Sequence, residues 1–281
     1  MTTAPRRRFS VRLGITEDTG DALYEGVPDH LLRPLQQWVY EIAERSEGYI
    51  GTTMCLRLRL TVSAKTNASW QLSQQTGMEL LDAVDEILAF LFEMDVHDQP
   101  EVHALGILLD DAGSAYRVAD DDGGLELRVS TGVSEAMRQT IADATGATSA
   151  GTAAEHLTAA WRTAYGLHPD PVRAYSEAIK AVECAAQSVI QPNHGRATLG
   201  TMLGEIKNAR AKFTTAISTP PSGDPIAPME AMMRALWDGQ TSRHGKQTGT
   251  VPETLEAARA GVHLAAALVQ WFVSGAVVRT P

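Results

Sequence analysis

The segment 237–245 brings together side chains that could do chemistry. It reads WDGQTSRHG and holds an indole, a carboxylate, an amide, hydroxyls, a guanidinium and an imidazole. An imidazole titrates near neutral pH and can take or give a proton, and a guanidinium can bind a phosphate through two hydrogen bonds. The segment is therefore a candidate site, with His244 and the adjacent Arg243 at its centre.

The same residues also have structural interpretations. Trp237 could end a helix as a core anchor or stack on a base, and Asp238 could cap or fix the turn. Gln240 and His244 could hydrogen-bond the loop backbone instead of a ligand. The sequence leaves these alternatives open.

Polar faces on two neighbouring segments could contribute to this site. Within 170–189, Lys180 and Glu183 lie on a polar stripe that could orient His244, although ion pairs between helices explain the stripe equally well. The next segment carries a basic face that is either solvated or binds phosphate, formed by Lys207, Arg210 and Lys212.

Helical periodicity dominates the chain that must position these residues. Apolar side chains recur at spacings of three and four, which is typical of helices that bury one face. The predicted helices cover 29–45, 78–94, a segment from 134 onward, 170–189, a segment from 198, a short one through 229–236, and 252–273.

Two segments have strand-like patterns. Residues 49–62 alternate leucine with arginine or cysteine, which predicts a strand, with a short helix as the alternative. Residues 105–129 contain short apolar runs at 107–109, 116–118 and 125–129, separated by Asp-Gly and Gly-Gly signals. We therefore expect a mainly α fold with a small antiparallel β-hairpin or meander near 105–129.

Charge divides the chain unevenly. Residues 1–149 hold 12 basic and 24 acidic side chains, whereas residues 150–281 hold 12 basic and 10 acidic ones. The net charge of −10 argues against binding nucleic acid by bulk counterion release, so any such contact must be local and come from the C-terminal half. With an Ala-, Thr- and Gly-rich linker at 142–153, the expected domains are 1–150 and 151–281.

The sequence favours a cytoplasmic location. No apolar stretch of signal-peptide length follows Arg6 to Arg8, and Cys55 and Cys184 are interpreted as two buried thiols rather than a disulfide. No charge occurs between Arg259 and Arg279, so a membrane anchor is one interpretation of this segment. A central helix buried on all sides is favoured because histidine and glutamine interrupt a mildly hydrophobic stretch.

Four stretches together resemble the abortive-infection C-terminal family of HEPN-like helical domains. They are AYSEAIKAVECAAQ, ATLGTMLGEIKNA, LWDGQTSRHG and ETLEAARAGVHLAAALVQWF, within about residues 152–275. The resemblance implies a HEPN-like helical bundle that forms a homodimer. In such ribonucleases an arginine precedes a histidine by four to six residues, and two protomers bring these pairs into one cleft.

The resemblance also implies roles for individual residues. His244 would be catalytic, with Arg243 directly before it or Arg234 further upstream supplying positive charge. A histidine of this kind exchanges the proton of a ribose 2′-hydroxyl while the arginine neutralises charge on the phosphate, so neither a metal nor another cofactor is required. The residues implied in binding are Trp237, Asp238, Gln240, Lys180, Glu183, Lys207 and Arg210.

Three functions are consistent with this resemblance. The chain could be an RNA-cleaving effector of a phage-defence or toxin system, or a catalytically silent dimer that binds RNA, a nucleotide or a protein partner of such a system. In the third, residues 1–150 would sense a trigger and the C-terminal half would respond. A Walker phosphate loop, paired C-x-x-C zinc motifs and the G-x-S-x-G motif of hydrolases are absent from the sequence.

Overall fold

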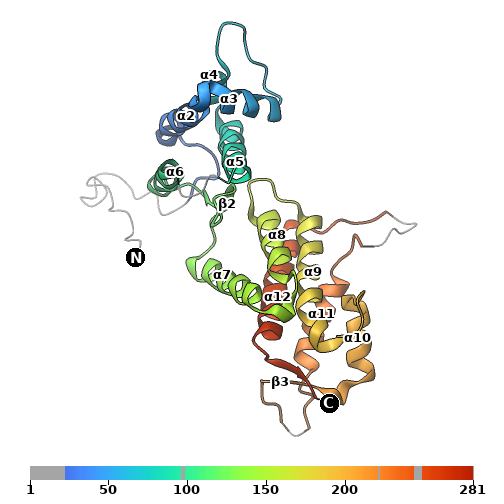
Figure 1. Ribbon diagram of the computed structural model, residues 1–281. Helices are drawn as coiled ribbons and strands as arrows, with labels where there is room; N and C mark the ends of the chain where they lie inside the picture. The colour runs from blue at the N-terminus through green and yellow to red at the C-terminus, as the bar shows by residue number, and fades with distance from the viewer. Residues whose placement is uncertain (1–22, 96–98, 221, 244–248, 281) are drawn as a thin grey trace, which may run out of the picture. The chain divides into compact units, whose positions relative to one another are not determined.

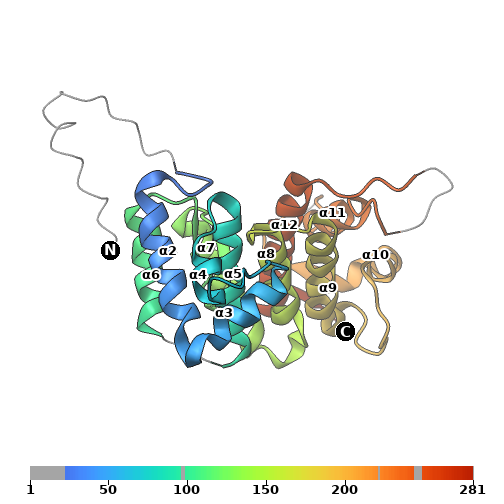
Figure 2. The ribbon, with the colours of Figure 1, turned by 90° about the horizontal axis from the view of Figure 1, so that it is seen from above.

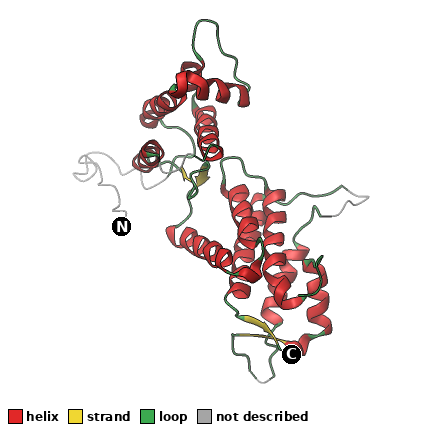
Figure 3. Cartoon of the chain, viewed as in Figure 1, coloured by secondary structure: helices red, strands yellow, loops and turns green. Residues whose placement is uncertain are grey.

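The computed structural model describes residues 23–95, 99–220, 222–243 and 249–280. This described part is mainly helical, with two small antiparallel sheets of two strands each, which confirms the expected fold class (Figure 3). The chain forms two compact units, Met1–Arg128 and Val129–Pro281, called here unit 1 and unit 2.

Unit 1 is built on apolar helix faces that the sequence predicts. The helix that begins at Asp29 buries Leu31, Leu35 and Ile42 along one side, and the long helix that begins at Gly77 buries Leu81 and Leu88. Such stripes drive packing because burying a leucine side chain removes apolar surface from water. The elements are α2 (Asp29–Ala43), α3 (Arg45–Arg57), α4 (Ala68–Ser73), α5 (Gly77–Glu93), α6 (Pro100–Asp111), β1 (Tyr116–Val118) and β2 (Leu125–Leu127).

The predicted strand at 49–62 is wrong, because most of this segment forms helix α3. Its buried residues Ile50, Met54 and Cys55 follow helical spacing, and α3 packs against α2 and α4. Leu56, part of the alternating pattern, is 75% exposed. The alternation of leucine with arginine therefore does not define the buried face of this segment, which is set by residues at helical spacing.

Of the hairpin or meander expected near 105–129, the structure shows a hairpin, and a helix precedes it. Strands β1 and β2 pair antiparallel, as predicted. The apolar run at 107–109 instead belongs to α6, which begins at Pro100 and buries Val102, Leu105 and Leu109 at helical spacing. Proline is favoured in the first turn of a helix, where its missing N–H is not needed.

In unit 2 a central helix is surrounded by others. Helix α12 packs against α7, α8, α9 and α11, and α8 and α9 run alongside each other (Figures 1 and 2). The elements are α7 (Thr131–Gly146), η1 (Thr148–Ala150), α8 (Ala153–Tyr165), α9 (Pro171–Ile190), α10 (Leu199–Asn208), η2 (Arg210–Lys212), β3 (Phe213–Thr215), α11 (Ala227–Asp238), α12 (Leu255–Val273) and β4 (Val277–Arg279).

The starts of the unit 2 helices follow from local chemistry. The side chains of Asp170, Thr198 and Thr254 each accept a hydrogen bond from a backbone N–H in the first turn of α9, α10 and α12. These caps satisfy donors that a helix leaves unpaired at its N-terminus. Among the described residues, no helix has the length and apolarity needed to cross a bilayer.

The boundary between the compact units lies earlier than the sequence suggested. Unit 2 begins at Val129, whereas the change in composition and charge pointed to a division after residue 150. Helix α7 packs against α8 and α12, which places it in the same core as the C-terminal helices. Cys55 is a buried free thiol, as expected, but Cys184 is partly exposed, and the two lie in different units.

Candidate functional site

Arg243 folds back onto the end of α11. Its guanidinium carbon lies 3.3 Å from the centre of a Trp237 ring, and its Nη1 donates to the Trp237 carbonyl at 3.1 Å. Trp237 in turn packs on Gly200 of α10, where an added Cβ would come within 2.6 Å of the indole. Trp237 therefore anchors α11 to α10 and holds Arg243 through a cation–π contact.

The two ends of the loop between α11 and α12 are tied together. The buried carboxylate of Glu253 accepts hydrogen bonds from the backbone N–H and the hydroxyl of Ser242, both at 2.9 Å. Thr241 donates its hydroxyl to the carbonyl of Val251 at 2.6 Å. Burial alone would raise the pKa of Glu253, but the bonds from Ser242 outweigh it and lower that pKa. The neck of this loop is thus fixed next to Arg243.

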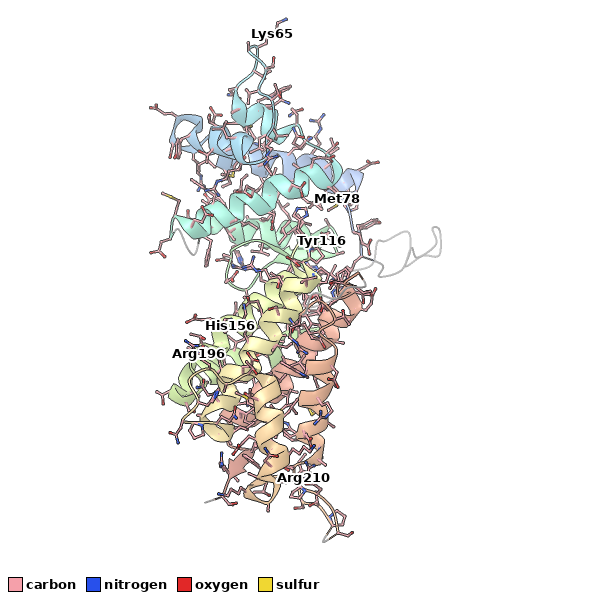
Figure 4. The ribbon with its side chains drawn as sticks, turned by 90° about the vertical axis from the view of Figure 1, so that its right-hand side faces the viewer. Lys65, Met78, Tyr116, His156, Arg196 and Arg210 are labelled. Atoms are coloured by element: carbon pink, nitrogen blue, oxygen red, sulfur yellow. The ribbon has the colours of Figure 1, made fainter. Side chains whose placement is uncertain are left out.

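A carboxylate on α9 holds an imidazole from α8. Glu177 contacts His156 Nδ1 through Oε2 at 2.7 Å and accepts from Lys180 Nζ through Oε1 at 2.8 Å (Figure 4 labels His156). Burial alone would raise the pKa of Glu177, but hydrogen bonds from Lys180 and His156 lower it, so the group is ionised at neutral pH. An ionised carboxylate only accepts, so Nδ1 carries the proton that points at Glu177, and in the neutral form of the ring Nε2 has a lone pair that can accept a proton.

Glu183 lies six residues after Glu177 on α9. Its Oε1 accepts the backbone N–H of Leu199 at 2.7 Å, in the first turn of α10, where a negative charge is favoured. Burial raises the pKa of Glu183, while the hydrogen bond from Leu199 and the charges of Arg243, Lys180 and protonated His156 act in the opposite direction. Since these three side chains all act on one carboxyl, we group His156, Glu177, Lys180, Glu183 and Arg243 as the α9 polar cluster.

Two other predicted cations are engaged in a separate ion-pair network. Arg210 pairs with Asp224 and Glu230, and Arg234 donates to the second oxygen of Glu230 at 2.8 Å. In this structure both guanidinium groups are therefore engaged with carboxylates, and neither lies in a contact with Arg243 or Trp237 that the structure shows. Lys207 is exposed on α10.

Three predicted residues remain, Asp238, Gln240 and His244, and the structure describes the first two. Asp238 is the last residue of α11 and is exposed, and Gln240 follows it and is half-buried. His244 lies outside the described residues. Of the predicted set, the structure therefore brings together Arg243, Trp237, Lys180 and Glu183.

Sequence reasoning missed His156, Glu177 as its partner, and Glu253. Glu177 was visible on the polar stripe of 170–189, but its partner lies 21 residues earlier on another helix. Glu253 directly precedes the cap residue of α12 and carries no motif of its own. No local pattern could have paired these groups.

Comparison with known proteins does not identify a family. No protein-family model matches the chain, and no curated protein or solved structure matches it. Within the described ranges there is also no group of three histidine, cysteine, aspartate or glutamate side chains arranged to hold a metal ion.

Proposed function

We propose that this protein is a metal-independent endoribonuclease whose chemistry is carried by the α9 polar cluster of unit 2. The observation that supports it is the pair between Glu177 and His156 Nδ1 at 2.7 Å, which leaves Nε2 to act as a base on a ring that shares Glu177 with Lys180. An imidazole held through one nitrogen by a carboxylate is the arrangement used for general base catalysis.

The proposed reaction is an internal transfer at phosphorus. His156 Nε2 takes the proton of the ribose 2′-hydroxyl, whose oxygen then bonds to the adjacent phosphorus while the bond from phosphorus to the 5′-oxygen breaks. Lys180 and Arg243 stabilise the added negative charge. His244, which follows Arg243 in the chain, protonates the leaving 5′-oxygen. The products are a 2′,3′-cyclic phosphate and a 5′-hydroxyl.

The biological setting we propose is phage defence or a toxin system, with the protein acting as a HEPN-like homodimer. This part of the proposal rests on the resemblance of residues 152–275 to the abortive-infection C-terminal family. Light scattering on the purified protein tests the dimer, because a mass of one 30.2 kDa chain would contradict it.

Cleavage of a fluorescent RNA in excess EDTA tests the chemistry. We expect His156→Ala and His244→Ala each to slow cleavage by about 10²- to 10⁴-fold, the usual contribution of a positioned proton-transfer group. The matched control is His194→Ala, which removes an exposed histidine of the same unit. Circular dichroism establishes that each variant is folded.

The possible results separate the parts of the proposal. Full activity of His244→Ala would remove that residue from the mechanism, and full activity of His156→Ala would remove the α9 polar cluster. If the wild-type protein does not cleave RNA in EDTA, the ribonuclease is ruled out. The alternative, a catalytically silent HEPN-like dimer that binds RNA, a nucleotide or a protein, would then remain.

A further inference from the structure

Unit 1 contains a groove between α2 and α4 that has no role in the proposed reaction. Its volume is about 550 Å³, which lies in the range of small-molecule sites. Its lining includes Arg33, Gln36, Tyr40, Trp70 and Ser73. Helices α2 and α4 contact each other within one compact unit, so both walls of the groove belong to the same unit.

Aromatic side chains form part of the wall. Trp70 is 45% exposed although it is the largest apolar side chain of α4, and Tyr40 is half-buried. The backbone N–H of Trp70 donates to the Asn67 side chain at 2.8 Å, which caps the first turn of α4. An exposed indole in the wall of a groove is a surface on which a planar ring can stack.

Two of the polar side chains that line the groove are buried. Gln36 is 8% exposed and Ser73 is 2% exposed. Gln36 Nε2 donates to the carbonyl of Gln75 at 3.1 Å, and its Oε1 accepts from Arg33 Nη1 at 3.4 Å. A side-chain amide has two N–H donors and two acceptor lone pairs, so these contacts use half of its capacity. The unused half matches the paired donor and acceptor on the edge of a nucleobase.

The charge of the lining selects against cations. It contains the guanidinium of Arg33 and no carboxylate. The absence of a carboxylate from the lining contrasts with residues 1–149 as a whole, which hold 24 acidic and 12 basic side chains. A guanidinium is suited to a phosphate because its N–H groups match two phosphate oxygens.

We infer that this groove binds a nucleoside monophosphate, with the base stacked on Trp70, its edge paired with Gln36, and the phosphate at Arg33. This site would make unit 1 the part of the protein that recognises a small-molecule signal. The inference is independent of the ribonuclease, since it concerns a different unit and different residues.

Calorimetric titration of the full-length protein with AMP, GMP, CMP and UMP tests the site. We expect at least one nucleotide to bind, and Trp70→Ala to weaken it by roughly 5- to 150-fold, the effect of losing one base-stacking contact. Trp70→Phe should retain most of the affinity because it keeps an aromatic face. The matched control is Tyr49→Ala, which removes an exposed aromatic of unit 1 outside the groove.

The phosphate contact needs its own comparison. Titration with the corresponding nucleosides should give weaker binding than the monophosphates, and Arg33→Gln should remove that difference. Arg59→Gln makes the same change of charge at an exposed position outside the groove and should have no effect. Failure of all four nucleotides to bind at millimolar concentration, or unchanged affinity in Trp70→Ala, would overturn the inference.

Discussion

Unit 2 holds two clusters of charged side chains, and they differ in how their carboxylates are paired. In the ion-pair network of Arg210, Asp224, Glu230 and Arg234, two arginines share two carboxylates. In the α9 polar cluster, Glu177 binds Lys180 through one carboxylate oxygen and Nδ1 of His156 through the other, so the contact with His156 does not use its Nε2. Figure 4 places His156 and Arg210 in different parts of the unit.

The difference shows that residue type alone does not decide how a cluster of charged side chains is paired. Hydrogen bonds from Arg234 and Arg210 lower the pKa of Glu230, as expected for an ion pair with a structural role. The pKa of Glu177 is lowered as well, but that of Glu183, on the same helix, is raised by burial. Carboxyl groups whose environments move their pKa values in opposite directions are typical of sites that transfer protons.

Replacing the central carboxylate of each cluster should give the largest difference between the two. Glu177→Gln removes the charge that fixes the tautomer of His156, so we expect RNA cleavage to slow by at least about 100-fold. Glu230→Gln should leave the cleavage rate unchanged and lower the free energy of unfolding by about 1 kcal/mol, because its partners are partly exposed. Equal cleavage rates for the two variants would contradict the distinction.

A glycine substitution tests the packing of α9, which carries the α9 polar cluster, against α12. Gly261 of α12 lies against the buried ring of Tyr175 on α9, and an added Cβ would come within 2.9 Å of it. Gly261→Ala should therefore lower the free energy of unfolding by roughly 1–2 kcal/mol, even after the gain in helix propensity.

Gly204 on α10 is the matched control for that substitution. An added Cβ there meets no atom within 4 Å. Gly204→Ala should raise the free energy of unfolding by about 0.5–1 kcal/mol, since alanine favours a helix over glycine. Urea denaturation measures both variants, and a change of the same sign in the two would argue against the tight contact between α9 and α12.

The smallest expected effect concerns Glu183. Burial raises the pKa of Glu183 in the folded protein, so at a pH above this raised pKa the buried carboxylate lowers the free energy of unfolding. This destabilisation disappears as the pH falls below 4.5, the ordinary pKa of the group, because the carboxyl is then protonated in both the folded and the unfolded protein. Glu183→Gln keeps an oxygen that can accept from Leu199. We expect it to raise the free energy of unfolding at pH 7 by less than about 1 kcal/mol. A gain that persists at pH 4 would contradict burial of the charge as its cause.

Much of the secondary structure could be predicted because its causes are local. The apolar stripe of α5 and the caps at Asp170 and Thr198 depend on residues three or four apart. The strand predicted at 49–62 failed because a period of two in leucines competed with the helical spacing of Ile50 and Met54, and packing against α2 and α4 selected the latter.

Local sequence is enough to specify the helical character of the chain and the polar side chains available on α9 and in the loop after α11. Which of these side chains meet depends on the packing of the whole unit. This packing sets Glu177 beside His156, Ser242 beside Glu253, and strand β3 beside β4, which begins 64 residues after β3 begins. The reason is that the periodicity of a helix is local, whereas its rotation and position against a neighbouring helix depend on how the whole core packs.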